Sequence, residues 1–147
     1  GDAYGSDERE RAAAFHRSAQ RCGATVTHSI QGDYSFGCGY ENAQSILRPG
    51  ARPDAIFCSA DTMALGAMDG ARALGLRVPQ DISVMGFDNN AVGRMPAYSL
   101  TTIGQVQGAL LNATIELLAA VLADNAHKED RLLPMELIIR GSVRIRE

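Results

Sequence analysis

Two aspartates and an arginine occupy positions at which an open α/β sheet would hold a small ligand. Asp88 directly follows an apolar run at 82–87, and Asp61 lies shortly after a second run at 54–58. Arg11 lies early in a predicted first helix. Ligands of such sheets bind where the strands end and the next helices begin. Because charged groups form strong hydrogen bonds with hydroxyls, this pattern indicates a site for a small polyhydroxylated ligand.

An aromatic side chain, Tyr34, lies in a predicted polar loop at 31–35, where its ring could cover the apolar face of a sugar or base. Position alone leaves a second interpretation open. In that interpretation Arg11 and Asp88 form surface salt bridges, and Tyr34 packs partly against the fold. We interpret Asp61 chiefly as the N-cap of the helix that follows it, in preference to one half of an acid/base pair.

Motifs of covalent, phosphate and metal chemistry are absent from the sequence. It has no G-x-S-x-G elbow, no phosphate-binding loop, no H-E-x-x-H pair and no complete dinucleotide fingerprint. The three cysteines, Cys22, Cys38 and Cys58, lack the paired spacing of a zinc site. We therefore expect no enzyme, no cofactor and no metal, and we expect the cysteines to be buried free thiols in a reducing cytoplasm.

Composition excludes several further classes. The 147 residues, of which 46% are hydrophobic and 21% charged, are typical of one average soluble domain. No run of eighteen apolar residues is present, so we expect no membrane span. A formal net charge of -3 disfavours strong binding to phosphate backbones, which depends on clustered cations. This chain by itself is therefore not expected to bind DNA.

Alternating helix and strand patterns must position the candidate side chains. The predicted elements are a helix at 6–21, a strand at 24–30, a helix at 36–47, a strand at 54–58, a helix at 61–74 and a strand at 82–87. Their short connections predict right-handed βαβ units, an α/β fold class and a doubly wound parallel sheet. Because such a unit begins with a strand, we expect one upstream of Gly1.

The pattern changes after residue 90. An irregular stretch at 91–99 and a brief β-like piece at 100–103 precede a long helix at about 105–123 and a final strand at 132–139. The long helix carries two adjacent apolar stripes, so it requires more than one neighbour to cover it. We expect the chain to bury these stripes by self-association.

Several segments resemble the effector domain of LacI/GalR-type bacterial transcriptional repressors. They are 53–67 (PDAIFCSADTMALGA), 75–89 (GLRVPQDISVMGFDN), 100–103 (LTTI) with Gln105, 11–15 (RAAAF, with Ala14 where the family has glycine), and Gly32-Asp33-Tyr34 with Gly39-Tyr40. The resemblance spans nearly the whole chain. It implies a periplasmic-binding-protein-like fold of two lobes, of which this chain is mostly the C-terminal lobe.

The resemblance also implies roles for particular residues. The ligand-binding positions of the family fall on Arg11, Tyr34, Ala60, Asp88 and Gln105. Ala60 stands where sugar-binding members often have Asn, so one hydrogen bond to a ligand hydroxyl is lost. The family also dimerises through this lobe, and the matching or neighbouring positions are Leu65, Met68, Arg72, Val92 and Met95. We expect Leu65 and Met68 to form a stripe apart from Met63, Ala67 and Leu74, which would face the sheet.

Three parts of the chain then have separate roles. Residues 1–103 would be the C-terminal lobe, 104–130 a crossover helix that belongs to the other lobe, and 131–147 a return strand and tail. The resemblance implies a cytoplasmic, homodimeric repressor that senses a sugar-like or nucleobase-like effector. It would bind operator DNA only through an N-terminal helix-turn-helix domain that this chain does not contain. The alternative is a solute-binding protein of a sugar importer, which shares the architecture.

Overall fold

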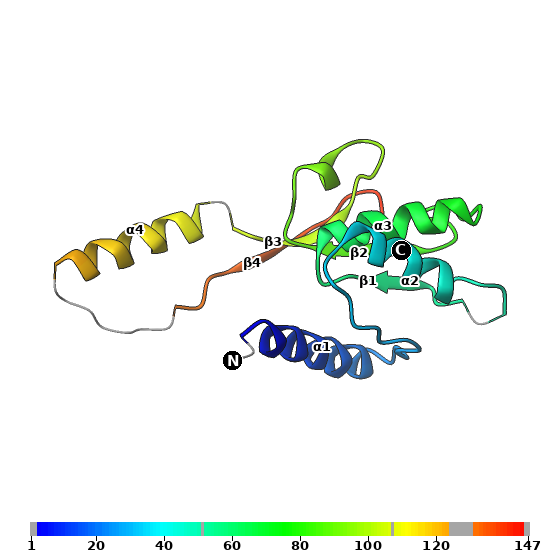
Figure 1. The fold of residues 1–147 in the computed structure, drawn as a ribbon, viewed down its shortest axis with the longest axis horizontal. Helices are drawn as coiled ribbons and strands as arrows, with labels where there is room; N and C mark the ends of the chain where they lie inside the picture. Colours follow the sequence, from blue (N-terminus) through cyan, green and yellow to red (C-terminus); the bar gives the residue numbers. More distant parts are fainter. Residues whose placement is uncertain (1–2, 51, 107, 124–130, 146–147) are drawn as a thin grey trace.

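The structure, a computed structural model, describes residues 3–50, 52–106, 108–123 and 131–145. Its elements in chain order are α1 (Ala3–Arg21), α2 (Phe36–Ile46), β1 (Ala55–Phe57), α3 (Asp61–Ala73), β2 (Ser83–Phe87), a 3-10 turn η1 (Val92–Arg94), β3 (Thr101–Gln105), α4 (Ala109–Leu122) and β4 (Met135–Ile138). The sheet has the order β1-β2-β3-β4 (Figure 1). Neighbouring strands are parallel from β1 to β3, and β4 is antiparallel to β3. The predicted α/β parallel sheet is confirmed, with an antiparallel strand added at its edge.

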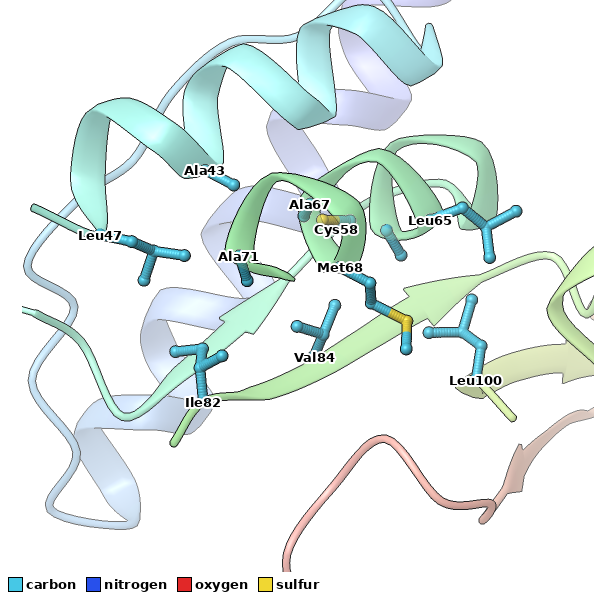
Figure 2. Packing of buried hydrophobic residues seen from close by; sticks show 11 residues of the cluster. Ala43, Leu47, Cys58, Leu65, Ala67, Met68, Ala71, Ile82, Val84 and Leu100 are labelled. Atoms are coloured by element: carbon cyan, nitrogen blue, oxygen red, sulfur yellow. The ribbon is translucent and has the colours of Figure 1, made fainter. Parts of the chain in front are cut away.

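Helices cover both faces of the sheet. Alternate residues of a strand point to opposite sides, so a strand can contact helices on both faces. Val84 in β2 faces α3 and belongs to the main core (Figure 2). On the other face Phe57 of β1 stacks on Phe15 of α1, with ring centroids 5.0 Å apart and an interplanar angle of 10°. Phe87, at the end of β2, lies under the guanidinium group of Arg11 in α1. The sheet is therefore doubly wound, as the sequence predicts.

The main core lies between α3 and the sheet, where Met68 points toward Val84 and Leu100 (Figure 2). Leu65 and Met68 are only 5% and 1% exposed, whereas Leu74 is 43% exposed. The expectation that Leu65 and Met68 form an outward stripe is therefore wrong. The reason is that α3 packs on the sheet along one side and on α2 along another, so its buried arc is wider than one stripe.

Glycines allow α2 and α3 to approach until their backbones touch. A Cβ atom on Gly66 would lie 2.0 Å from the carbonyl oxygen of Phe36, and one on Gly39 would lie 2.1 Å from that of Met63. No side chain larger than hydrogen fits at either position without moving a helix. Since α3 begins directly beside the candidate site, this contact fixes the helix that frames it.

The stretch at 24–30 forms no strand, which corrects the prediction. A strand requires a neighbour for its backbone hydrogen bonds. A groove of about 680 Å³, lined by residues of this stretch and by 52–58, separates it from β1. Within the described part of the chain no other strand lies in this groove to pair with it.

The bounds of the elements around β3 and β4 also differ from the prediction, because the hydrogen bonds between these two strands determine where they begin and end. Gln105 pairs with Met135, so it ends β3 instead of beginning the long helix, and α4 starts at Ala109. At the other strand Pro134 has no N–H to donate, and β4 begins only after it. The first helix begins at Ala3, earlier than the predicted Ser6. Part of the predicted crossover segment, 124–130, lies outside the described residues.

The cysteines occupy three different environments. Cys22 is exposed, Cys38 is intermediate and Cys58 is buried. The prediction of three buried thiols is therefore wrong for Cys22, which follows the end of α1 and faces solvent. Burial raises the pKa of the Cys58 thiol to about 12, with smaller contributions from Cys38 and Asp61.

These environments predict selective thiol chemistry. At neutral pH an aromatic disulfide reagent should modify Cys22 rapidly, whereas Cys58 should react only after unfolding, because the thiolate is the nucleophile. Between the ordinary pKa of 9.0 and about 12 the unfolded chain loses this proton and the folded chain keeps it. Stability should therefore decline as the pH rises through this window. Peptide mapping after labelling identifies the modified residue, and early labelling of Cys58 in the folded protein would contradict the assignment.

Helix α4 extends away from the rest of the molecule (Figure 1), and none of its 14 residues is buried. Leu111, Leu118 and Leu122 are 63%, 57% and 79% exposed. A helix with so much exposed apolar surface gains roughly 25 cal/mol per Å² when another surface covers it. Within 3–50, 52–106, 108–123 and 131–145, no helix combines the length and apolarity needed to cross a membrane.

We expect this chain, expressed alone, to self-associate through α4 at micromolar concentration. Replacing both Leu111 and Leu118 by Glu should shift the population toward monomer, because a charged side chain disfavours burial of the helix. Asn112→Glu adds a charge to the same helix without removing an apolar side chain and is the matched control. Light scattering measures the mass, and a monomer in the unsubstituted chain would refute the expectation.

Candidate functional site

Two contacts hold Arg11 at the ends of β1 and β2. Its Nη1 donates a hydrogen bond to the carbonyl oxygen of Ser59 at 2.8 Å. Its Cζ lies 4.0 Å from the centroid of the Phe87 ring, a cation–π distance. Ala60, the next residue after Ser59, is buried at 6% exposure and is the N-cap of α3. The ends of β1 and β2 therefore share one guanidinium group, as the sequence predicts for Arg11.

Asp88 directly follows β2 and has a backbone φ of +107°, in a region that L-residues rarely adopt. Its backbone N–H donates to the carbonyl oxygen of Ile103 at 2.8 Å, which ties the turn to β3. Partial desolvation raises the pKa of the Asp88 carboxyl, and the negative charge of Asp61 raises it further. The nearby Arg11 acts in the opposite direction. The predicted carboxylate and guanidinium therefore lie in one electrostatic environment.

Asp88 and Gln105 line a common open depression at the carboxyl ends of β2 and β3. Asn89, which the sequence also places just after the run at 82–87, shares it, together with three polar residues that the sequence did not predict, Arg94, Glu136 and Arg140. The prediction of site residues covered only the ends of parallel strands. Glu136 and Arg140 come from β4 and the residues just after it, and the antiparallel pairing brings them here. Glu136 is the one charged residue within the apolar run at 132–139, and this exception to the pattern is a signal that could have identified it.

Asp61 is not an N-cap, which corrects the chief interpretation of this residue. It is the first residue of α3, and its side chain is 0% exposed. Its carboxyl oxygens accept hydrogen bonds from the Asn90 backbone at 2.7 Å and from the Thr102 hydroxyl at 2.6 Å. It therefore bonds to the turn after β2 and to β3 instead of to its own helix.

Tyr34 occupies the turn before α2, with a φ of +64° and 39% exposure. Ser35 caps α2 by accepting a hydrogen bond from the Cys38 backbone at 3.0 Å, and Asp33 accepts one from the Ser35 backbone at 2.9 Å. Hydrogen bonding from the side chain of Ser35, and then from its backbone N–H, lowers the pKa of the Asp33 carboxyl. Among the described residues, no hydrogen bond or ring contact joins Tyr34 to Arg11. The structure thus gathers Arg11, Ala60, Asp88 and Gln105 near the strand ends and leaves Tyr34 unconnected to them.

The residues predicted for a dimer interface divide into two groups. Leu65 and Met68 are buried in the core of the chain itself. Val92 and Met95 are 42% and 53% exposed beside η1. Arg72 bonds to the carbonyl oxygen of Ala97 at 2.6 Å, which attaches the segment after η1 to α3. Of these five residues, only Arg72, Val92 and Met95 are exposed.

A family model of the periplasmic binding protein-like domain matches residues 1–143. The chain belongs to this family, in agreement with its doubly wound sheet and the polar groups at the strand ends. It is homologous to LacI-family repressors, and the resemblance stated from the sequence is confirmed.

Particular relatives support the assignment. The transcriptional repressor CytR of Escherichia coli strain K12 is 36% identical over 137 residues, which is 91% of this chain and 40% of that protein. The repressor PurR of Klebsiella pneumoniae is 40% identical over 110 residues, 74% of this chain and 32% of that protein. A structure of the Lac repressor dimer bound to operator and the anti-inducer ONPF aligns with a TM-score of 0.82 at 32% identity, covering 92% of this chain and 47% of that one. This chain thus spans less than half the length of each.

Proposed function

We propose that this chain is the effector-binding and dimerisation part of a LacI-type transcriptional repressor. The observation that carries the proposal is the joint placement of Arg11 and Asp88 at the ends of adjacent strands, with Gln105 on the same edge of the sheet. A charged donor and a charged acceptor so placed suit a small ligand with several hydroxyl groups. CytR and PurR are repressors, which favours this function over a solute-binding protein of an importer and over an enzyme.

The ligand in this proposal is a sugar-like or nucleobase-like molecule. Asp88 and Arg11 would bind its hydroxyls, Gln105 would contact it from β3, and Tyr34 would cover an apolar face after a movement of the turn before α2. Ala60 supplies no hydrogen bond at its position. The site is open in the described chain, because the depression beside Asp88 lies on the surface.

A second lobe closes the site in this proposal. Residues 1–103 form the C-terminal lobe, 104–130 provide a crossover helix that packs in the other lobe, and 131–147 return to the sheet. The exposed apolar surface of α4 supports this division. Ligand binding between the lobes would change their relative angle, and it can do so only by binding one arrangement more tightly than the other.

Dimerisation would couple this change to DNA. We assign Arg72, Val92 and Met95 to the interface, with Leu65 and Met68 supporting it from the core beneath. Two N-terminal helix-turn-helix domains of a cytoplasmic homodimer would then contact two operator half-sites, and their spacing would follow the lobe angle.

The full product of the gene that encodes this chain tests the proposal. Its binding to DNA from its own promoter region is measured by fluorescence anisotropy, with a panel of aldoses and nucleosides added one at a time. One class of compound should change the DNA affinity through the differential binding described above. A product that binds a panel member but no DNA would favour the importer protein. A product that binds neither would overturn the proposal.

A further inference from the structure

Asp61 is a buried carboxyl group, and neither ligand contact nor helix capping explains why an aspartate stands at this position. Its side chain is 0% exposed, and both of its oxygens are hydrogen-bonded to other elements. Gly86 in β2 provides the space, because a Cβ atom there would lie 2.2 Å from Asp61 Oδ1. A buried charge requires such partners, and these all belong to β2, β3 or the turn between them.

The turn that Asp61 holds has an unusual backbone. Asp88 and Asn89 have φ values of +107° and +57°, so two consecutive residues other than glycine lie at positive φ. Such conformations persist only where surrounding contacts enforce them. The Asn90 N–H bonds to Asp61 Oδ2 at 2.7 Å directly after this pair. The Thr102 hydroxyl bonds to Asp61 Oδ1 at 2.6 Å.

Two further contacts hold the same turn from its other side. The Asn89 N–H donates weakly to Thr102 Oγ1 at 3.4 Å, and Arg140 Nη2 donates to Asn89 Oδ1 at 2.6 Å. Asn90 continues into η1, where its Oδ1 accepts the Gly93 N–H at 2.8 Å. Asp61 therefore lies among the contacts that hold the turn that carries Asp88.

We propose that Asp61 is a positioning residue for ligand binding: through Asn90 and Thr102 it fixes the turn that presents the Asp88 carboxylate. It touches no ligand itself. The inference rests on the proposed function for the role of Asp88, but the fixing of the turn by Asp61 can be tested without any ligand. A role limited to packing would stabilise the fold as a whole without protecting the Asn90 amide in particular.

The substitutions separate charge from geometry. Asp61→Asn keeps the shape and can keep both hydrogen bonds if the Thr102 hydroxyl rotates to accept from the new amide, but it removes the negative charge. Asp61→Ala removes both acceptors, and Thr102→Val removes one of the two partners at nearly constant volume. Ser142→Ala is the control, because the Ser142 hydroxyl is also buried and bonds to the Val84 carbonyl and the Thr101 N–H, not to the turn.

Two ligand-free measurements on this chain test the positioning role. In Asp61→Asn the pKa of Asp88, followed by carboxyl carbon NMR, should fall in part, because desolvation still raises it but the charge of Asp61 no longer does. In Asp61→Ala hydrogen exchange at the Asn90 amide should accelerate by about tenfold or more, since its acceptor is lost. Thr102→Val should accelerate it less. Should Asp61→Ala fail to fold, hydrogen exchange in Thr102→Val still decides the matter.

Ligand affinity in the full gene product completes the test. With the aldose or nucleoside that binds the unsubstituted protein, Asp61→Asn should retain most of the affinity, and Thr102→Val should lose about fivefold. Hydrogen exchange at the Asn90 amide that is unchanged in Asp61→Ala and Thr102→Val, or equally accelerated in Ser142→Ala, would overturn the positioning role. If no panel compound binds the unsubstituted protein, the proposed function fails, while hydrogen exchange at the Asn90 amide still decides whether Asp61 holds the turn.

Discussion

Asparagine in place of Asp88 is expected to weaken ligand binding by about thirtyfold, or about 2 kcal/mol, in the full gene product. The substitution keeps the shape of the side chain but replaces a charged acceptor by a neutral one, and hydrogen bonds to charged groups are the stronger kind. The nearby Arg11 also loses its electrostatic partner. Titration calorimetry with the aldose or nucleoside that binds the unsubstituted protein measures the effect.

The pH dependence provides a second measure of the same group. Because the pKa of Asp88 is raised, its carboxylate becomes protonated at a higher pH than an ordinary aspartate. Ligand affinity should be complete well above this pKa and should fall as the pH decreases through it, and Asp88→Asn should remove this dependence. Asp54→Asn makes the same change before β1, at the opposite end of the strand, and should have no effect. Equal affinity for Asp88→Asn and the unsubstituted protein would remove Asp88 from the site.

Alanine in place of Gly66 is expected to lower the free energy of unfolding by about 3 kcal/mol, at the upper end of the usual effect of overpacking. The added methyl group would lie 2.0 Å from the carbonyl oxygen of Phe36 and 2.9 Å from the backbone nitrogen of Tyr40. Both obstacles are main-chain atoms of α2, which cannot rotate away as a side chain can. The two helices must separate, and the core beneath them loosens. Urea unfolding followed by circular dichroism measures the loss.

Gly37→Ala is the matched control for this substitution. Gly37 also lies in α2, but a Cβ atom there meets only the Ser35 hydroxyl, at 3.9 Å. Since alanine restricts the unfolded chain and favours helix, we expect Gly37→Ala to be neutral or to stabilise by up to about 1 kcal/mol. A Gly66→Ala protein as stable as Gly37→Ala would show that α2 and α3 are not in close contact.

Local sequence patterns predicted most of the sheet and the helices that carry the site. Short apolar runs at 54–58 and 82–87 contain β1 and β2, and their bounding polar residues mark the strand ends. Arg11 and Asp88 could be selected because strand ends in a parallel sheet meet at one edge. The same reasoning missed Arg140, which an antiparallel strand brings to Asn89.

The elements that the sequence misjudged depend on neighbours far along the chain. The alternation at 24–30 is a valid strand pattern, but a strand forms only beside a partner, and the described sheet provides none there. Leu65 and Met68 looked outward because one helix face was assumed to be buried, whereas α3 is covered along two sides. Asp61 looked like an N-cap because an aspartate at the start of a helix often is one, yet it is the first residue of α3 and its bonds are to Asn90 and Thr102.

Sequence by itself determined the order of the helices and of the four strands of the sheet, the fold class and the residue types at the strand ends. These follow from periodicity and from residue chemistry, which are local properties. Tertiary structure alone decided which side chains meet: the contact of α2 with α3 through Gly39 and Gly66, the antiparallel addition of β4, and the attachment of the Asp88 turn to Asp61. Such pairings depend on how distant segments pack, and no local pattern encodes which of several compatible surfaces will be brought together.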